Sequence, residues 1–517
     1  MHLFRSDRQP VSWLAPLVIL GAAGFAFVLY GWTAAPGITW AHQGADGGEL
    51  LAAAMVNGVP HPPGYPLYTT LLQAWLALTG ALMPARDLAW RGSLFSALAA
   101  AWSVGVTVSV AAHLLREQRA RWLWALLTAL AWAFTPLFWD QAVITEVYAL
   151  HGLAAALLGW ALLVKRGARR WVIPVTALGV AHHLTFLLLL PAAAYYLWSI
   201  SDGSGWFRLR SMVITLALGG IIGALFHLRT PLVAGGGGTP PPVNWGYADN
   251  LNGFWWLVSG SAYRGYLFNL EPKDILGRVG GWAYTLTRQY TWVGLGLSLI
   301  GLSYLDAHRP RLRNFGLLWI LPVSLYSVSY YTRDSDIYLL PVAWMMALWL
   351  GVGAATSVEW VSGRWSRSWL EPALRGVAVV GVIALLVLHF PEASLHHDRE
   401  AEQFLAQVIE IVEPNAIIVT STDATTFAIW YGAWGGGELL DAAPDAIVLN
   451  YALYQFDWYR RLQADLHPGI PGIGESVSAV VAANGGERPV YFTEVIPEFT
   501  DQHASPVGPL WRYDYDR

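Results

Sequence analysis

The chain alternates long apolar runs with short connecting segments that carry its charges. From the N-terminus to Phe390, eleven apolar runs approach the roughly 20 residues that a helix needs to cross a bilayer. They predict membrane-spanning helices over residues 11–30, 91–113, 122–138, 142–164, 171–182, 184–199, 211–228, 283–305, 314–330, 337–357 and 375–390. The pattern therefore predicts an α-helical polytopic membrane protein with about 11 transmembrane helices.

The composition agrees with this prediction and excludes several function classes. Of the 517 residues, 55% are apolar, 14% are aromatic and only 13% are charged, which is too apolar for an ordinary soluble domain. A formal net charge of −4, with no zinc-finger or helix-turn-helix pattern, indicates no nucleic-acid partner. Because the chain has no cysteine, disulfides, thiol catalysis and iron–sulfur ligation are excluded.

The basic residues predict the orientation in the membrane. Loops rich in lysine and arginine stay in the cytoplasm. On one side of the predicted spans lie Arg5, Arg8, Arg116, Arg119, Arg121, Lys165, Arg166, Arg169, Arg170, Arg208, Arg210, Arg309, Arg311, Arg313, Arg364 and Arg367. We therefore expect a multi-pass protein of the cell membrane with a cytoplasmic N-terminus, and a first span retained as an anchor rather than cleaved as a signal peptide. The 31–90 loop, the 229–282 loop, the turn at 333–336 and the tail after Phe390 then face outward.

After Phe390 the pattern becomes that of a small soluble α/β unit. The segment predicts helices and β-like runs over residues 396–412, 416–420, 424–433, 446–450 and 490–493. The expected domains are therefore a transmembrane domain over 1–390, with a catalytic first outer loop at 31–90, and an extracytoplasmic α/β domain over 391–517. Within the second domain, the segment from Thr422 to Thr426 could bind an acceptor or simply cap a helix.

The strongest candidate for chemistry lies in the first outer loop. Asp46 and Glu49 are three residues apart, so they share one face of a predicted short helix, whose first turn favours acidic groups. The prolines and glycine of His61-Pro-Pro-Gly-Tyr-Pro66 then stiffen a tight turn that holds His61 and Tyr65. We predict Asp46 as a general base with Glu49 as a second carboxylate. The alternative is that both acids only cap a surface helix.

Three further candidates lie in the predicted spans. Glu146, near the start of the fourth span, would cost about 2.5–3.5 kcal/mol at the bilayer centre, so it faces a polar cavity or lies high enough to reach water. His182 and His183 stand where two short runs meet, which predicts a re-entrant or thinned-membrane hairpin. Two histidines that cap a hairpin near the interface are the alternative.

Two arginines are candidates for holding a phosphate, and three acids are candidates for a metal. Arg229, at the outer end of the seventh span, and Arg333, beside the tenth, could each bind phosphate through the guanidinium fork. Snorkelling to the membrane interface is the alternative for each arginine. Asp336 could join Asp46 and Glu49 around Mg²⁺ or Mn²⁺, which prefer hard oxygen ligands, although a solvated turn also explains Asp336. No cofactor is indicated with certainty.

The motifs together resemble a known family. In order, they are Asp46-Gly-Gly-Glu49, His61-Pro-Pro-Gly-Tyr-Pro66, Trp139 with Glu146-Val-Tyr148, His183-Leu-Thr185, Asn244-Trp245-Gly246, Thr422-Asp423-Ala-Thr-Thr426 with Trp430-Tyr431, and Asp445 with Asn450. The chain from about residue 40 to 465 is similar to a bacterial membrane family related to the eukaryotic transmembrane-protein O-mannosyltransferases. That resemblance implies the GT-C class of membrane glycosyltransferases, which use polyprenyl-phosphate-linked sugars and carry an aspartate in the first outer loop, here Asp46. Relatives usually have Ser-Gly where this chain has Gly47-Gly48, which leaves the division of roles between Asp46 and Glu49 open.

We therefore predict an inverting glycosyltransferase in the membrane. It would move a sugar, for which mannose is one candidate, from a polyprenyl-phosphate donor to a hydroxyl of a protein or glycan on the outer face. The predicted catalytic residues are Asp46 and Glu49, and the predicted substrate-binding residues are His61, Tyr65, Glu146, His182, His183, Arg229, Arg333 and Asp336.

A transporter or lipid flippase without transferase activity is the alternative. Intramembrane histidines, an acid and a broken helix pair are also features of transporters. Against this alternative, the sequence contains no inverted repeat, and the carboxylate segment lies in a loop rather than at the midplane of the membrane.

Overall fold

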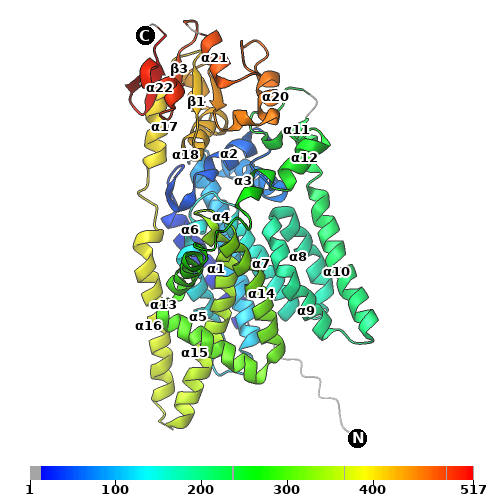
Figure 1. The fold of residues 1–517 in the computed structure, drawn as a ribbon. Coiled ribbons are helices and arrows are strands. Elements are labelled where there is room, and N and C mark those ends of the chain that lie inside the picture. Colours follow the sequence, from blue (N-terminus) through cyan, green and yellow to red (C-terminus); the bar gives the residue numbers. More distant parts are fainter. Residues whose placement is uncertain (1–12, 236–237, 366, 485, 516–517) are drawn as a thin grey trace.

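The structure is a computed structural model that describes residues 13–235, 238–365, 367–484 and 486–515. Arg5 and Arg8 lie outside these ranges, as do the first two residues of the span predicted at 11–30. Figure 1 shows a tall bundle of helices with a small sheet and its helices stacked on one end, where the C-terminus lies. The predicted combination of a helical body with a C-terminal α/β region is therefore present.

Every predicted span overlaps at least one helix of the bundle. These helices are α1 (Leu14–Thr33), α4 (Leu88–Leu114), α5 (Arg121–Ala133), α6 (Pro136–Ala142), α7 (Tyr148–Leu163), α8 (Ala168–His182), α9 (Leu190–Ile200), α10 (Gly205–Phe226), α13 (Ile275–His308), α14 (Pro310–Ser329), α15 (Leu340–Arg364) and α16 (Leu370–Ala393).

Fewer helices meet a strict criterion for crossing a membrane. In the part of the chain that the structure describes, five helical segments are long and apolar enough, and the pair α5–α6, bent by 70°, would make a sixth. They begin at Leu14, Leu88, Gly205, Ser335 and Leu370. Several apolar helices thus support a multi-pass protein, whereas the count of eleven stays a prediction.

The segment before α7 is not helical, which corrects the position predicted for Glu146. The predicted fourth span begins at residue 142, but α7 begins at Tyr148 and Glu146 lies in the break after α6. Local hydrogen bonds stabilise this break. The hydroxyl of Ser96 accepts from the backbone N–H of Glu146 at 3.2 Å, and the Glu146 carboxylate accepts from the N–H of Val147 at 2.9 Å. The backbone N–H groups of Glu146 and Val147 thus donate to side-chain oxygens instead of to the backbone carbonyls of a continuing helix.

The predicted interruption at the histidine pair is present. α8 ends at His182, and the 3₁₀ helix η2 (Leu184–Leu189) precedes α9. His183 itself is extended, and its Nδ1 accepts from the backbone N–H of Thr185 at 3.2 Å, which caps η2. Whether this break is re-entrant in a bilayer stays a prediction.

The outer segments contain more helix than predicted. In the first outer loop, the predicted short helix is α2 (Asp46–Met55), but α3 (Pro66–Leu82) was not predicted. Pro66 starts α3 because its fixed φ suits the first helical turn. The second outer segment forms α11 (Arg229–Ala234), η3 (Trp245–Tyr247), α12 (Leu251–Val258) and η4 (Ser261–Tyr266), and the 3₁₀ helices η1 (Ala41–Gln43) and η5 (Ser335–Leu339) complete this end.

The C-terminal region is built on a five-stranded sheet with the order β2-β1-β3-β5-β4. β1 (Ile417–Thr420) pairs in parallel with both β2 (Ile447–Asn450) and β3 (Val490–Phe492), as the predicted βαβ pattern requires. The antiparallel hairpin of β4 (Ala504–Val507) and β5 (Leu510–Tyr513) was not predicted. The surrounding helices are α17 (Glu400–Ile411), α18 (Asp423–Trp430), the π-helical turn η6 (Tyr431–Gly435), α19 (Glu438–Ala442), η7 (Leu453–Gln455), α20 (Asp457–Leu466), α21 (Val477–Ala483) and α22 (Pro497–His503).

The outer helices share a hydrophobic core with this sheet. Ala52 and Ala53 of α2, together with Leu257 of α12, belong to the same buried cluster as the strand residues Ile417 and Leu449. Figure 1 shows α2 beside α18, between the sheet and the bundle. The sheet is thus packed onto the segment that carries the candidate carboxylates. The domain boundary at residue 390 stays a prediction.

Candidate active site

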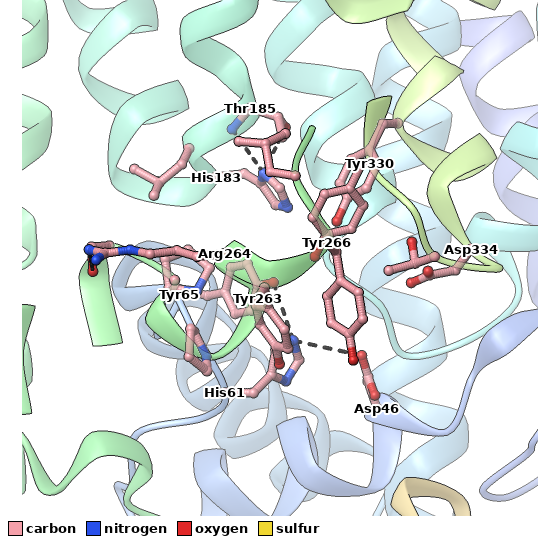
Figure 2. Close-up of a pocket in the computed structure, with 18 of the residues that line it drawn as sticks. Asp46, His61, Tyr65, His183, Thr185, Tyr263, Arg264, Tyr266, Tyr330 and Asp334 are labelled. Carbon is pink, nitrogen blue, oxygen red and sulfur yellow. Dashed lines mark hydrogen bonds and ion pairs between the residues drawn. The ribbon is translucent and has the colours of Figure 1, made fainter. Parts of the chain in front are cut away.

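A cavity of about 400 Å³ lies where α2, the turn after it, η4, the segment before η5 and α18 meet. Figure 2 shows how these elements converge on it. It is lined by Asp46, His61, Pro62, Pro63, Tyr65, Tyr148, His183, Leu184, Thr185, Trp245, Ser259, Gly260, Tyr263, Arg264, Tyr266, Leu267, Tyr326, Tyr330, Thr332, Asp334, Tyr338, Asp423 and Phe427. Such a volume accommodates a small ligand in a polar and aromatic environment.

The acids of α2 and His61 form a connected group. His61 donates its backbone N–H to Oε1 of Glu49 at 3.1 Å, and its Nδ1 contacts Oε2 of the same carboxylate. Its Nε2 lies 3.7 Å from Oδ2 of Asp46 and 3.2 Å from the hydroxyl of Tyr65. The Glu49 side chain is fully buried, whereas that of Asp46 is 36% exposed. Of the two acids, only Asp46 therefore lines the cavity.

Burial and the charges within this group shift the pKa values of Asp46 and His61. Burial raises the pKa of Asp46 to about 6, although the charge of His61 opposes the shift. Burial alone would lower the pKa of His61, but the carboxylates of Glu49 and Asp46 reverse this and raise it to about 10. At neutral pH, His61 is therefore a cation and Asp46 is mostly ionised, with its proton affinity close to the working pH.

Two glycines allow α2 to reach this position. A Cβ on Gly47 would lie 3.0 Å from the backbone oxygen of Thr145, and a Cβ on Gly48 would lie 2.8 Å from the carbonyl carbon of Phe427 in α18. Both distances are too short for a side chain without movement of the backbone opposite. The Gly-Gly pair of the motif thus places Asp46 and Glu49 against both the bundle and the C-terminal region.

Aromatic rings form much of the cavity wall, and sequence reasoning missed most of them. The ring of Tyr65 lies 5.5 Å from that of His183, which in turn lies 5.6 Å from Tyr148. Further hydroxyls come from Tyr263, Tyr266, Tyr326, Tyr330 and Tyr338. The tyrosines after residue 260 belong to elements far along the chain, and no spacing in the sequence marked them.

The predicted arginines lie outside the described lining of this cavity. Arg229 donates to the side-chain oxygens of Asn57 at 2.7 Å and Gln73 at 3.1 Å, so it ties α11 to the first outer segment. Arg333 lines a separate cavity of about 210 Å³, together with Asp336. Arg264 lines the main cavity instead and donates to the hydroxyl of Ser259 at 2.7 Å. In Figure 2, Asp46 and Asp334 lie on one side of the cavity and Arg264 on the other.

The remaining predicted residues are placed as follows. His61, Tyr65 and His183 line the cavity with Asp46. His182 lies behind it, where its imidazole Nε2 is 3.0 Å from the backbone oxygen of Val147. Glu146 is also buried and outside the described lining.

The three acids predicted as metal ligands do not converge. Glu49 is engaged by His61, and Asp336 lines the other cavity beside Arg333. Among the residues that the structure describes, no group of three or more His, Asp or Glu side chains is placed to hold a metal ion. Dependence on Mg²⁺ or Mn²⁺ stays a prediction.

Two acids from other segments enter the cavity. Asp334 precedes η5, and Asp423 opens α18 in the C-terminal region. Burial, and then the charge of Asp46, raises the pKa of Asp423 above its usual range. The sequence marked the segment around Asp423 as a helix start, an acceptor-binding candidate and a motif of the resemblance. The pairing of that helix with α2 could not be read from it.

Comparison with known proteins follows the same segments. Residues 46–203 match the family model described as "Protein O-mannosyl-transferase TMEM260 N-terminal domain". This segment is therefore similar to the N-terminal domain of TMEM260 proteins. The chain is 21% identical over 533 aligned residues to Protein O-mannosyl-transferase tmem260 of Dictyostelium discoideum, covering 90% of this chain and 62% of the relative. It is 35% identical to the TMEM260 protein of Mus musculus over 115 residues, which are 22% of this chain and 15% of that one. The chain thus spans less than two thirds of the relatives' length.

Solved structures show the fold over nearly the whole chain. ArnT from Cupriavidus metallidurans in the apo state aligns with a TM-score of 0.54 at 12% identity, covering 96% of this chain and 97% of that chain. ArnT bound to undecaprenyl phosphate aligns with a TM-score of 0.53 at 12% identity, covering 94% of each chain. The resemblance to TMEM260 proteins and to the GT-C class, predicted from the motifs, is therefore confirmed.

The segment that matches the TMEM260 N-terminal domain model supplies only part of the cavity. Asp46, His61 and His183 come from it, whereas Arg264 and Asp423 come from segments after residue 203. The cavity is therefore formed jointly by residues 46–203, the segment 229–282 and the C-terminal region.

Proposed function

We propose that the chain is an inverting membrane glycosyltransferase that moves a sugar from a polyprenyl-phosphate donor to a hydroxyl acceptor. The observation that carries the proposal is a carboxylate, Asp46, that faces a cavity beside the His61 cation, whose other nitrogen is held by the buried Glu49. The relatives are named protein O-mannosyl-transferases, and one structural neighbour is bound to undecaprenyl phosphate. These names favour mannose as the sugar, a protein hydroxyl as the acceptor and a lipid-linked donor.

In the proposed reaction, Asp46 accepts the proton of the acceptor hydroxyl. The acceptor oxygen then bonds to the anomeric carbon on the face opposite the phosphate, and the bond from that carbon to the phosphate oxygen breaks. The configuration at the anomeric carbon inverts, and the lipid phosphate leaves with the electron pair. A base whose pKa lies close to the working pH suits this proton transfer.

His61 and Glu49 are positioning residues in this proposal. The buried Glu49 carboxylate fixes the imidazole through both the ring and the backbone of His61. The resulting cation keeps Asp46 ionised despite its burial. This arrangement supports Asp46, rather than Glu49, as the base.

The pH dependence tests this division. We expect transfer to increase as the pH rises through about 6, because only ionised Asp46 accepts a proton. In Glu49→Gln the charge that holds the proton on His61 is lost, so the cation beside Asp46 weakens and the acidic limb moves to higher pH. The measurement is kcat/KM against pH for both proteins. An acidic limb unchanged by Glu49→Gln would contradict the role proposed for Glu49.

Arg264 is our candidate for the leaving phosphate, in place of Arg229 and Arg333. It is the arginine in the described cavity lining, and guanidinium matches phosphate geometry. We expect Arg264→Ala to weaken binding of an unreactive polyprenyl-phosphate analogue by about tenfold or more, since charge-assisted bonds contribute roughly 1.5–3 kcal/mol. Arg264→Lys should weaken it less. Calorimetry in detergent measures both.

Arg229→Ala is the matched control for donor binding, because that arginine bonds to Asn57 and Gln73 instead. Donor affinity unchanged in Arg264→Ala but reduced in Arg229→Ala would return the role to Arg229.

The basic loops support a cytoplasmic N-terminus and an active cavity on the outer face of the cell membrane. A reporter enzyme fused after Arg517 is therefore expected to be active only outside the cytoplasm. Fusion after Arg364, in a predicted cytoplasmic loop, provides the opposite control. Cytoplasmic activity of the C-terminal fusion would mean that one predicted span does not cross, and the 171–199 pair is the first candidate.

Product analysis decides between transfer and the alternative of a transporter or flippase. Purified protein is incubated with a panel of polyprenyl-phosphate sugars and hydroxyl acceptors, and the products are identified by mass spectrometry. A transferase forms a glycosidic bond and releases the lipid phosphate. Movement of intact donor between leaflets of vesicles, with no cleavage, would overturn the proposal.

A further inference from the structure

A second cavity, of about 520 Å³, lies between α12 and the start of α20. It adjoins the candidate active site through two consecutive residues. Trp245 lines the first cavity and Gly246 lines the second. The Trp245 ring lies 6.2 Å from that of His61 on one side and 5.9 Å from that of Trp458 on the other. A single aromatic wall therefore separates the two sites.

Three aromatic rings line the second cavity. The ring of Trp256 lies 5.2 Å from Trp458 and 5.3 Å from Phe456, and the rings of Phe456 and Trp458 are nearly parallel at 6.1 Å. All three side chains are half-buried, so their edges are fixed by packing while part of each ring remains accessible. Half-buried aromatic surface at a cavity is a common means of binding a partly apolar ligand.

Polar groups surround the rings. Asn252 and Gln455 both line the cavity and are exposed. Within the described part of the chain, the Asn252 carboxamide makes no hydrogen bond, so its donor and acceptor are both free. Arg461 is held rigidly, because it donates to Asp249 at 2.7 Å and its guanidinium stacks over Tyr247 at 4.3 Å.

We propose that this second cavity binds a saccharide ring that the acceptor already carries. One face of a pyranose presents C–H groups that pack on an indole, and its rim presents hydroxyls that both donate and accept. Trp256 and Trp458 supply the first kind of contact, and Asn252 and Gln455 supply the second. The acceptor role rests on the proposed function, whereas saccharide binding itself does not.

The position of the second cavity would allow it to orient the acceptor in the candidate active site. A sugar unit bound here would hold the next hydroxyl of the same glycan beside Trp245, at the edge of the cavity that Asp46 lines. Binding at a point remote from the reacting atoms raises the local concentration of the hydroxyl. The subsite would then favour an acceptor that already carries a sugar over the same acceptor without one.

The test uses saturation-transfer NMR to measure binding of three glycosides to the full chain in detergent. The glycosides are methyl α-D-mannopyranoside, methyl α-D-glucopyranoside and methyl α-D-galactopyranoside. We expect at least one glycoside to bind, and Trp256→Ala to weaken it by about tenfold, as for loss of one aromatic anchor. We also expect Asn252→Ala to weaken glycoside binding. Because Asn252 is exposed, this substitution should leave the fold unchanged, so the loss of binding would report on the cavity itself. Trp255→Ala is the matched control, because Trp255 is 62% exposed and outside the described lining of this cavity.

Asp46→Asn separates this proposal from the proposed function, because it should abolish transfer and leave glycoside binding unchanged. Equal binding by wild type, Trp256→Ala and Asn252→Ala would overturn the subsite. So would binding of none of the glycosides, or displacement of a bound glycoside by a proline- and serine-rich peptide, which would make the cavity a peptide site. Equal weakening by Trp255→Ala and Trp256→Ala would also overturn it.

Discussion

Replacing Asp46 with asparagine is expected to reduce sugar transfer by about 10²–10⁴-fold, the usual cost of losing a general base. The change is nearly isosteric, and the Asp46 side chain is partly exposed to the cavity rather than packed in the core. The protein should therefore keep its thermal transition in detergent. Initial rates with a saturating polyprenyl-phosphate donor, together with donor binding, measure the effect.

Two comparisons make this result specific. Asp441→Asn changes an exposed acid on α19 outside the cavity lining and should leave the rate unchanged. Glu49→Gln should lower the rate through His61 but retain more activity than Asp46→Asn. Full activity in Asp46→Asn with inactivity in Glu49→Gln would assign the base to Glu49.

Replacing Gly48 with alanine is expected to lower both stability and activity, although alanine favours helix. The helical gain is about 0.5–1 kcal/mol. The new Cβ, however, would lie 2.8 Å from the carbonyl carbon of Phe427, and overpacking of this kind costs about 1–3 kcal/mol. To relieve the contact, α18 must move away from α2 and carry Asp423 with it. A displacement near 1 Å at a reacting site costs on the order of 10²-fold in rate.

Gly220→Ala in α10 is the matched control for this substitution. It is also a helical glycine, but its Cβ would meet nothing within 4 Å. We expect its melting temperature to be unchanged or raised, while that of Gly48→Ala falls. Equal melting temperatures and rates for the two variants would show that the close approach of α2 and α18 does not matter.

The sequence predicted what depends on local pattern. Apolar runs located the helices of the bundle, and alternating apolar and helical segments predicted the parallel arrangement of β1, β2 and β3. Asp46, Glu49 and His61 were all predicted as site residues of one loop, and they lie within sixteen positions of one another. Their contacts through the imidazole of His61 were not predicted.

Contacts between distant segments could not be predicted in the same way. Arg229 ends a predicted span and looked suited to phosphate, yet its nearest acceptors are Asn57 and Gln73. Arg264 lies in a segment with no distinctive pattern, and it enters the cavity only because η4 folds over it. Asp423 depends on the approach of α18 to Gly48, which no property of either segment alone specifies.

The contribution of α18 to the cavity has a consequence for biosynthesis. Asp46 and His61 leave the ribosome first, and Asp423 follows His61 after a further 362 residues (423 − 61). At about 5–20 residues per second, the interval is some tens of seconds. During that time the nascent protein contains Asp46 and His61, but the cavity around them lacks the wall that α18 supplies. Transfer that depends on the closed cavity is therefore expected to begin only after α18 has been synthesised and has packed against α2.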